Sequence, residues 1–389
     1  MQHQLARRAR GHQRSMIREV TSYIESHGGI NLGQGTCALP PHPRVLEAAQ
    51  RAIASGHHHY TRFDGIPSLK EAIANRYQIH NRLPITPENV LVTGGATGAF
   101  ECICRSFVEP GDEVILLEPT YQYHVLQVLE QGGVPRYVRL SPPDWSVVPE
   151  ELERAITAKT KLLVMSNPNN PTGRVFSRAE LEMIGAICRK AGILVVSDEV
   201  YEYVLSEGQT HLSMASLPDM FEHTLTISSA SKTLFVTGWR VGWVVGPASV
   251  MPALGVKSDL TYVCAPAPLQ AALAECLTFG EEFFHSLTLT FQQKRRQLCA
   301  ALRSAGFKFQ SPEGTYYILA EYDRSSYGSD LDAMKGLMDS AGVGAVPGNA
   351  FYPTVKNTGR LRFCFAVSDD LLNQACERLS YQNLCVGAM

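Results

Sequence analysis

One lysine has neighbours that are unusual for a surface side chain. Lys232 lies within 227–243, where a strand-like segment ends in small hydroxyl residues and a Gly-Trp-Arg turn follows. A lysine amine with a lowered pKa forms Schiff bases with carbonyl compounds, and small neighbours leave room for a bulky aldehyde. Ser229, Ser231 and Arg240 can bind phosphate oxygens beside it. Most lysines are solvated surface residues, so the rest of the chain must support this interpretation.

An aspartate ends one of the apolar runs. Asp198 directly follows Ile193–Ser197, and a carboxylate at the buried end of a strand is costly unless a cation or donor meets it. A protonated pyridine nitrogen is such a cation, and the carboxylate would keep the ring protonated as an electron sink. An aspartate at a helix N-cap fits the same pattern, so this residue alone leaves both interpretations open.

Three other loops carry residues that can meet a ligand. The Gly-Gly-Ala-Thr-Gly turn at 94–98 can present helix N-terminal N–H groups to an anion. Tyr121 is either a core aromatic or a ring stacked on a flat ligand. Asn170 precedes Pro171 in a loop stiffened by two prolines, which would hold its amide rigidly. Each feature is also common in ordinary turns and cores, and only their combination favours function.

All of these residues follow short apolar runs. The runs are Val90–Thr93, Val114–Leu117, Leu162–Met165, Ile193–Ser197, Thr224–Ile227 and Val241–Val245, and they alternate with helical patterns near 97–108, 121–132 and 177–191. Continuous apolar strands separated by helices predict an α/β fold with a mostly parallel sheet covered on both faces. Ligands bind beyond the carboxyl ends of such strands, so we expect the candidate residues to lie close together.

A second, smaller unit is predicted outside this pattern. Its elements are a helix at 16–27, a short strand opening into a glycine turn at 30–35, a long linking helix at 281–304, strands at 307–310, 315–321 and 360–367, and helices near 330–341 and 369–380. Alternation in the last strand puts Arg360, Arg362 and Cys364 on one face.

Composition indicates an ordinary globular protein. The 389 residues are 45% hydrophobic and 19% charged with a net charge of −2, which gives no electrostatic case for nucleic acid or an anionic membrane. No run approaches the length of a membrane span. The ten cysteines lack zinc-ligand spacing and predict reduced thiols in a cytoplasm.

Two local features have competing interpretations. Arg7, Arg8, Arg10 and Arg14 could belong to an organelle transit peptide, but we expect a docking arm because structure is predicted to begin almost at once. His57-His58-His59 suggests a metal site, yet adjacent residues point in different directions and no partner has ligand spacing. No metal site is therefore predicted.

In their order along the chain, these motifs resemble a known family. The Asn-Pro-x-Asn-Pro-x-Gly loop at 167–173, Ser-x-x-Lys at 229–232 and Gly-Trp-Arg at 238–240 are together highly specific. From Asn31 to about Leu379 the chain resembles class I aminotransferases with the pyridoxal-phosphate (PLP)-dependent aspartate-aminotransferase fold, fold type I. The most similar branch holds kynurenine, glutamine, methionine and bacterial aspartate-type aminotransferases.

The resemblance implies a domain organisation. A large PLP-binding domain with a mostly parallel seven-stranded sheet is expected at 46–285, and a smaller α+β C-terminal domain at 286–389. Residues 1–45 are expected to form an N-terminal arm and part of the small domain.

The resemblance also implies roles for the cofactor site. Lys232 would carry the cofactor and move the proton, Asp198 would pair with the pyridine nitrogen, and Tyr201 and Asn170 would hydrogen-bond the phenolic oxygen. Tyr121 would stack on the ring. The remaining cofactor-binding residues, mostly around the phosphate, would be Gly95, Ala96, Thr97, Ser229, Ser231, Arg240 and the partner subunit's Tyr60.

Substrate contacts are implied in the same way. Arg362 would clamp the α-carboxylate with its two-pronged guanidinium. A backbone amide near Gly35 and the Asn170 side chain would lie against the substrate, and Tyr262 would border the neighbouring subunit's pocket. A homodimer with shared active sites follows from these expectations.

The function predicted is a PLP-dependent aminotransferase that moves the amino group of an L-amino acid to a 2-oxo acid by a ping-pong mechanism. A carbon–sulfur β-lyase requires the same residues and is the main alternative, followed by oxidative or decarboxylating PLP chemistry. A PLP-binding regulator is disfavoured because there is no room for a DNA-binding domain before residue 30. An NAD-binding protein is disfavoured because no GxGxxG follows the first sheet strand. No second arginine for a dicarboxylic side chain is evident, so an aspartate preference is doubtful.

Overall fold

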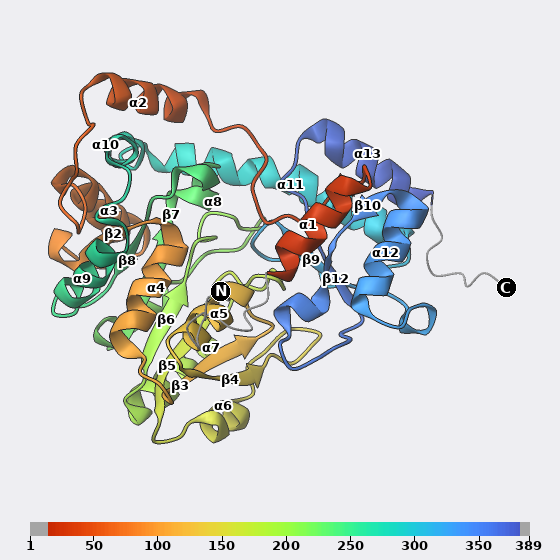
Figure 1. Cartoon of the computed structure of the whole chain (residues 1–389), viewed down its shortest axis with the longest axis horizontal. Coiled ribbons are helices and arrows are strands. Elements are labelled where there is room, and N and C mark those ends of the chain that lie inside the picture. The colour runs from red at the N-terminus through yellow and green to blue at the C-terminus, as the bar shows by residue number, and fades with distance from the viewer. Residues whose placement is uncertain (1–14, 382–389) are drawn as a thin grey trace, which may run out of the picture.

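A seven-stranded sheet forms the centre of the larger part of the molecule (Figure 1). The computed structural model describes residues 15–381, so the four N-terminal arginines discussed above lie outside the described residues. The strand order is β2-β8-β7-β6-β5-β3-β4, and β8 is antiparallel to both of its neighbours while the other pairs are parallel. The strands are β2 (Val90–Thr93), β3 (Glu113–Glu118), β4 (Val134–Arg139), β5 (Thr160–Ser166), β6 (Leu194–Asp198), β7 (Thr224–Ser229) and β8 (Gly242–Val245).

Both faces of this sheet are apolar, which explains the uninterrupted hydrophobic runs. In β3, Val114 and Leu116 pack on one face with α4 and α5, whereas Ile115 and Leu117 pack on the other face with α7. Because side chains alternate along a strand, a sheet buried on both faces needs apolar residues at every position. The helices of this part are α2 (Pro43–Ala54), α3 (Pro67–His80), α4 (Gly95–Phe107), α5 (Gln122–Glu130), α6 (Pro149–Ala155), α7 (Arg178–Ala191), α8 (Ala230–Thr233), α9 (Met251–Tyr262) and α10 (Ala267–Cys276).

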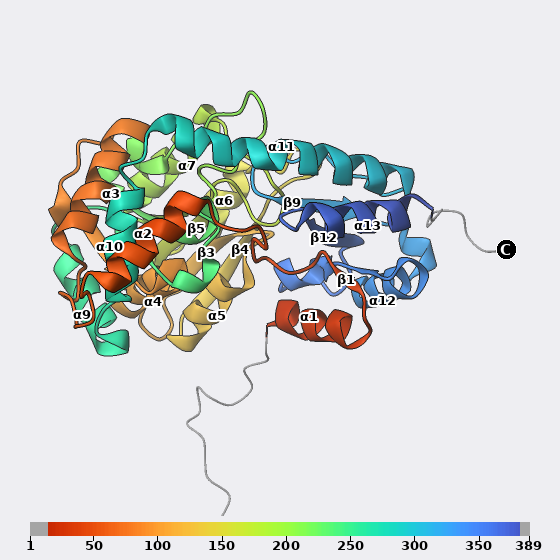
Figure 2. The same ribbon diagram turned by 90° about the horizontal axis from the view of Figure 1, so that it is seen from above.

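The smaller part is built from an N-terminal and a C-terminal segment of the described chain. Strand β1 (Ile30–Asn31) pairs in parallel with β10 (Val343–Gly344), and β11 (Val346–Pro347), β12 (Arg360–Cys364) and β9 (Tyr317–Glu321) form an antiparallel sheet. Its helices are α1 (Met16–Ser26), α12 (Asp330–Ala341) and α13 (Asp369–Ser380). Helix α11 (Glu281–Ser304) runs along both parts of the molecule (Figure 2). Serine hydroxyls at Ser329 and Ser368 cap α12 and α13, which fixes where these helices begin.

One predicted strand is absent, and one observed strand was not identified from the sequence. No strand forms at 307–310: Lys308 and Glu321 make one isolated bridge, and the chain then turns so that Glu313 and Gly314 donate to the carbonyl of Gly173. Strand β4 was not among the predicted apolar runs. It lies at the sheet edge, where most of its side chains are exposed or half-buried, so no continuous hydrophobic run marks it.

The structure also bears on membrane insertion, metal binding and the state of the cysteines. None of the helices within residues 15–381 is both long and apolar enough to cross a membrane. Across the same residues, no group of three or more His, Cys, Asp or Glu side chains could hold a metal ion, and His57, His58 and His59 are all exposed. The nine cysteines in the described part of the chain are free thiols.

Candidate active site

Lys232 lies on the one-turn helix α8, directly after the carboxyl end of β7. Its Nζ donates to the backbone carbonyl of Gly35 at 2.9 Å, although the two residues are 197 positions apart. The pKa of the Lys232 amine is lowered from 10.5 to about 8, mainly by desolvation and in smaller part by the nearby Arg362 guanidinium, against the opposing effects of two thiols and Asp198. The neutral, nucleophilic form of this amine is therefore far more populated near neutral pH than in an ordinary lysine.

This pKa predicts a pH dependence in the cofactor-free protein. We expect the rate of reductive methylation of Lys232 by formaldehyde to rise with pH through a midpoint near 8 and then level off, because the neutral amine reacts. At pH 7 roughly a tenth of the amine would be neutral, against roughly one part in 3,000 for a pKa of 10.5. Peptide mass spectrometry over a pH series, with Lys161 as an internal reference, gives the midpoint. A Lys232 rate still climbing tenfold per pH unit above pH 9.5 would contradict the lowered pKa.

The loop Gly33–Gly35 brings a second predicted residue to the same place. Arg362, on β12, is 1% exposed and donates from Nη2 to the carbonyl of Gly33 at 2.8 Å and from Nη1 to Oδ1 of Asn170 at 2.9 Å. Its guanidinium carbon lies 4.0 Å from the ring centroid of Tyr317, whereas its buried Nε has no hydrogen-bond partner in the described part of the chain. A buried cation with a free donor is suited to receive a carboxylate.

Asp198 meets a partner that the sequence did not suggest. Its carboxylate lies 3.2 Å from Nε2 of His124, and Oδ1 accepts from the backbone N–H of Val200 at 3.3 Å. His124 is in the first turn of α5, and the ring of Tyr121 meets it edge-on at 5.5 Å. The histidine orients the carboxylate. The only sequence signal was its position three residues after Tyr121.

The turn behind Asp198 is anchored by a buried ion pair. Glu199 is fully buried and lies 2.9 Å from Nε2 of His211, and its other oxygen accepts from Ser197, Ser213 and the N–H of Met214. These contacts hold the backbone between two predicted catalytic residues. No sequence pattern predicted them.

The turn predicted to bind an anion lies at the start of α4. Gly94 is its N-cap residue and supplies no side-chain cap, so the first N–H groups of Gly95–Thr97 remain available. Arg240 donates to the carbonyl of Gly94 at 3.2 Å, and a Cβ on Gly95 would lie 2.3 Å from Nη2 of that arginine. Gly95 also has a φ of +79°, which favours glycine at this position. Ser229, also buried, pairs with Gly242 at the adjacent strand ends.

Tyr262 also lies at this turn, within its own chain. Its hydroxyl accepts from the N–H of Gly94 at 2.7 Å and from Ser258 at 2.9 Å. A Cβ on Gly94 or Gly98 would lie 3.2–3.3 Å from the tyrosine side chain, so the ring supports the anion loop. Its predicted role at a neighbouring subunit's pocket stays a prediction.

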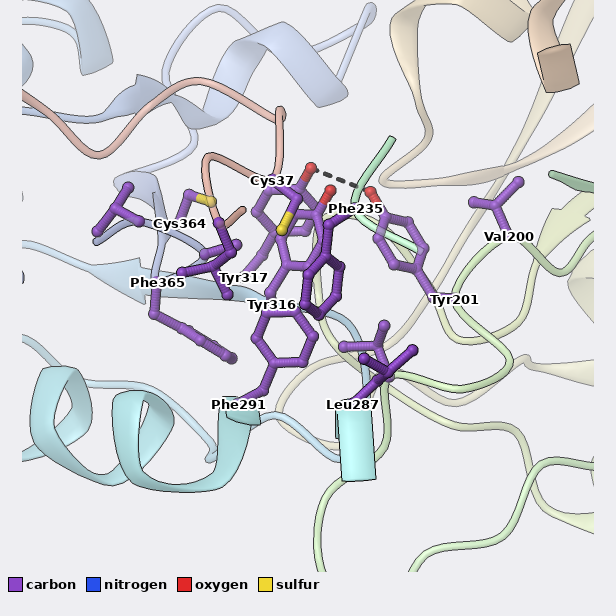
Figure 3. Close-up of a cluster of buried hydrophobic side chains, with 14 of the residues drawn as sticks. Cys37, Val200, Tyr201, Phe235, Leu287, Phe291, Tyr316, Tyr317, Cys364 and Phe365 are labelled. Carbon is purple, nitrogen blue, oxygen red and sulfur yellow. Dashed lines mark hydrogen bonds between the residues drawn. The ribbon is translucent and has the colours of Figure 1, made fainter. Parts of the chain in front are cut away.

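Tyr201 is buried, and its hydroxyl lies 3.0 Å from that of Tyr317 (Figure 3). Tyr316 and Tyr317 both donate to the carbonyl of Gly35, at 3.1 and 3.3 Å, which is the same oxygen that Lys232 contacts. Ser231 is buried next to Lys232 on α8. Tyr60, by contrast, is 82% exposed between α2 and α3 and lies outside this enclosure.

These residues fit PLP on their own chemistry. A buried amine of lowered pKa suits the aldehyde, an uncapped helix N-terminus with Arg240 suits the phosphate, and the Asp198 carboxylate suits a pyridinium nitrogen. The free Nε of Arg362 remains for a substrate carboxylate.

Comparison with known proteins places this arrangement in a family. The family model for class I and II aminotransferases matches residues 27–379. Kynurenine–oxoglutarate transaminase 1 of Mus musculus is 35% identical over 410 residues, which cover 96% of each chain. The chain therefore belongs to the class I and II aminotransferases, and it is an enzyme of this PLP-using family.

Solved structures agree with this assignment and with the predicted fold. N-succinyldiaminopimelate aminotransferase from Mycobacterium tuberculosis superposes with a TM-score of 0.92 and 34% identity, covering 97% of this chain and 100% of that one. Aspartate aminotransferase from Thermus thermophilus, solved with maleate, gives 0.91 and 33%, covering 98% and 100%. Three relatives named for different amino donors are thus about equally similar to this chain, so similarity alone does not select a substrate.

Proposed function

We propose that this protein is a PLP-dependent aminotransferase that takes the amino group of an L-amino acid and, in a second half-reaction, transfers it to a 2-oxo acid. The observation that carries this proposal is the convergence of Lys232 and Arg362 on the loop Gly33–Gly35. The Lys232 amine and the Arg362 guanidinium both contact this three-residue loop, so they lie close together. This arrangement matches a substrate whose amino group and carboxylate are attached to the same carbon.

In this proposal each side chain of the site has a separate role. When bound, PLP supplies an aldehyde that condenses with amines and a ring that accepts electrons. Lys232 moves a proton at its Nζ, and the Gly35 carbonyl holds that atom in place. Arg362 binds the carboxylate and orients the substrate's Cα–H bond. Asp198, which contacts His124, would keep the ring nitrogen of the cofactor protonated, and Tyr201 and Asn170 would donate to its phenolic oxygen.

The test follows the cofactor and the products separately. Adding PLP to the cofactor-free protein should produce a visible absorbance band, and an L-amino acid should bleach it with stoichiometric release of its 2-oxo acid. A second 2-oxo acid should then restore the band. Release of ammonia with pyruvate, and no recovery of the band, would instead support the β-lyase alternative. Screening donors against pyruvate, 2-oxoglutarate and glyoxylate would identify the substrates.

We also propose a homodimer with shared sites as the active unit. Exposed apolar side chains gather on the segment before α3 and on α9: Tyr60, Phe63, Val256, Leu260 and Val263. The two segments touch, because a Cβ on Gly255 would lie 2.5 Å from the ring of Phe63. An exposed apolar patch of this kind supports an interface with a second copy of the chain, and Tyr60 on that patch would then face the partner.

Replacing Tyr60 with phenylalanine should weaken PLP affinity by roughly one to two decades, because one charge-assisted hydrogen bond to phosphate is worth about 1.5–3 kcal/mol. The decisive measurement mixes Tyr60→Phe chains with Lys232→Ala chains under limiting PLP. If the sites are shared, one site of each hybrid dimer carries both changes and the other carries neither, so activity rises above both parents. No rise, with subunit exchange confirmed, would show that Tyr60 does not complete the partner's site.

The predicted cytoplasmic location and the domain boundaries at 45 and 285 remain part of this proposal. The free thiols support a reducing compartment. The pairing of β1 with β10 supports an N-terminal segment that contributes to the small domain.

A further inference from the structure

Tyr317 is buried between the two parts of the molecule and touches three of the residues assigned above. It is the first residue of β9 and pairs across the small sheet with Cys364 of β12. Its side chain is 1% exposed and points toward Tyr201, which follows β6 of the large sheet (Figure 3). No role was predicted for this residue from the sequence.

The ring and the hydroxyl of Tyr317 make different contacts. The ring lies against the guanidinium of Arg362, at 4.0 Å from centroid to carbon, and Phe351 contacts the same guanidinium at 4.7 Å. The hydroxyl lies 3.0 Å from that of Tyr201 and donates to the carbonyl of Gly35 at 3.3 Å. A Cβ on Gly35 would lie 2.6 Å from the same oxygen, so only glycine admits this hydroxyl.

Counting protons limits what the pair of hydroxyls can do. Each phenol has one proton to donate, and the Gly35 carbonyl can only accept. If Tyr317 donates to Gly35, it accepts from Tyr201. Once Tyr201 donates to an oxygen elsewhere in the site, the 3.0 Å contact holds a hydrogen bond only if Tyr317 donates to Tyr201. The carbonyl of Gly35 then keeps Tyr316 as a donor.

We propose that Tyr317 is a positioning residue whose hydroxyl strengthens the donation by Tyr201 and whose ring holds the guanidinium of Arg362 flat for a carboxylate. This inference rests on the proposed PLP-dependent function, because it needs an acceptor oxygen for Tyr201. Hydrogen bonds in series polarise one another in a site shielded from water, which makes Tyr201 the stronger donor. A guanidinium stacked on an aromatic face keeps its edge free for bidentate binding.

The hydroxyl should affect the titration of the bound cofactor. A stronger donor to the cofactor's phenolic oxygen favours the form of the lysine-linked cofactor that has lost its proton, so it lowers the pH at which the visible band titrates. Titratable groups around the Tyr201–Tyr317 pair are Lys232, Asp198, Arg362, Cys37, Cys364, Tyr316 and Tyr121. Replacing Tyr317 with phenylalanine leaves all seven in place.

The experiment compares Tyr317→Phe, Tyr317→Leu and the control Tyr77→Phe in PLP-loaded protein. Tyr77 is a buried phenol that contacts Trp243 at 3.3 Å, so its variant removes a buried hydroxyl away from Tyr201. We measure the pH midpoint of the visible band without substrate, and the affinity for 3-phenylpropionate by calorimetry. Tyr317→Phe should raise the midpoint by roughly half a pH unit, about threefold in the dissociation constant of the proton, with carboxylate affinity unchanged within twofold. Tyr317→Leu should raise the midpoint similarly and weaken the carboxylate about threefold to thirtyfold.

Three results distinguish a wrong role for the Tyr317 hydroxyl, a wrong role for its ring and a wrong proposed function. An unshifted midpoint in Tyr317→Phe, or an equal shift in Tyr77→Phe, would overturn the role of the hydroxyl. Equal carboxylate affinities in the two Tyr317 variants would overturn the role of the ring, and Tyr317→Met provides the ring comparison if leucine reduces the folded yield. Absence of any visible band in the wild-type protein with PLP would instead refute the proposed function itself.

Discussion

Lys232→Ala should abolish transamination, lowering kcat/KM by at least about 10⁴-fold, because the variant loses both the nucleophile and the proton carrier of one site. The fold should remain intact. The amine makes one hydrogen bond, to Gly35, and that carbonyl keeps Tyr316 and Tyr317 as donors. PLP should still bind through the helix α4 turn, Arg240 and Asp198, but without the visible band that depends on linkage to the lysine.

The thermal stability of the cofactor-free variant provides a control with a definite sign. Burial penalises the protonated amine, and the Lys232 pKa is about 8 in the folded protein against 10.5 otherwise. The folded wild-type protein therefore bears this penalty in full below about pH 8 and loses it as the pH rises to 10.5. The stability of Lys232→Ala relative to wild type should therefore be highest below about pH 8 and should fall as the pH rises from 8 to 10.5. Near-wild-type transamination by this variant would refute the assignment of Lys232.

The elements that position the site were largely predictable, because burial on both faces forces a simple pattern. Helices α11, α12 and α13 begin and end at the predicted residues, and strong helical periodicity with serine caps at α12 and α13 explains this. The edge strand β4 was missed because its side chains face solvent, and a local apolar pattern cannot mark such a strand. At 307–310 the apolar side chains pack against the core, but the backbone forms only an isolated bridge and no strand. Composition alone cannot distinguish such a segment from a strand.

The candidate site was predicted where residue type and loop position coincide. Lys232, Asn170 and Arg362 are distant in sequence, yet the structure joins all three through the loop Gly33–Gly35 and the contacts between them. The partners His124 and Tyr317 could not be inferred. An aromatic or imidazole side chain near an apolar run is most often core, and only the packing of two parts of the chain reveals which atom it meets. The residues that contact the predicted site residues are thus determined by tertiary packing, which cannot be predicted from local sequence patterns.

Arg362→Leu should lower kcat/KM for every active L-amino acid by roughly 10²–10⁴-fold, because two charge-assisted hydrogen bonds to the α-carboxylate are lost together. The loss should be similar from one donor to the next. Amines that lack the carboxylate but carry the same side chain should react as slowly with the variant as with wild type. Single-turnover bleaching of the visible band measures both sets under the same conditions.

Arg362→Lys is the matched variant for this test. It keeps the positive charge but cannot present two parallel N–H groups, and a lysine ammonium stacks less well on Tyr317 and Phe351, so it should restore only part of the loss. Removing the guanidinium also leaves Oδ1 of Asn170 and the carbonyl of Gly33 without this donor, and thermal unfolding reports that cost separately. A defect confined to one amino donor would place Arg362 in the side-chain pocket. A uniform defect that spares the simple amines would place it at the α-carboxylate, where the convergence with Lys232 requires it to be.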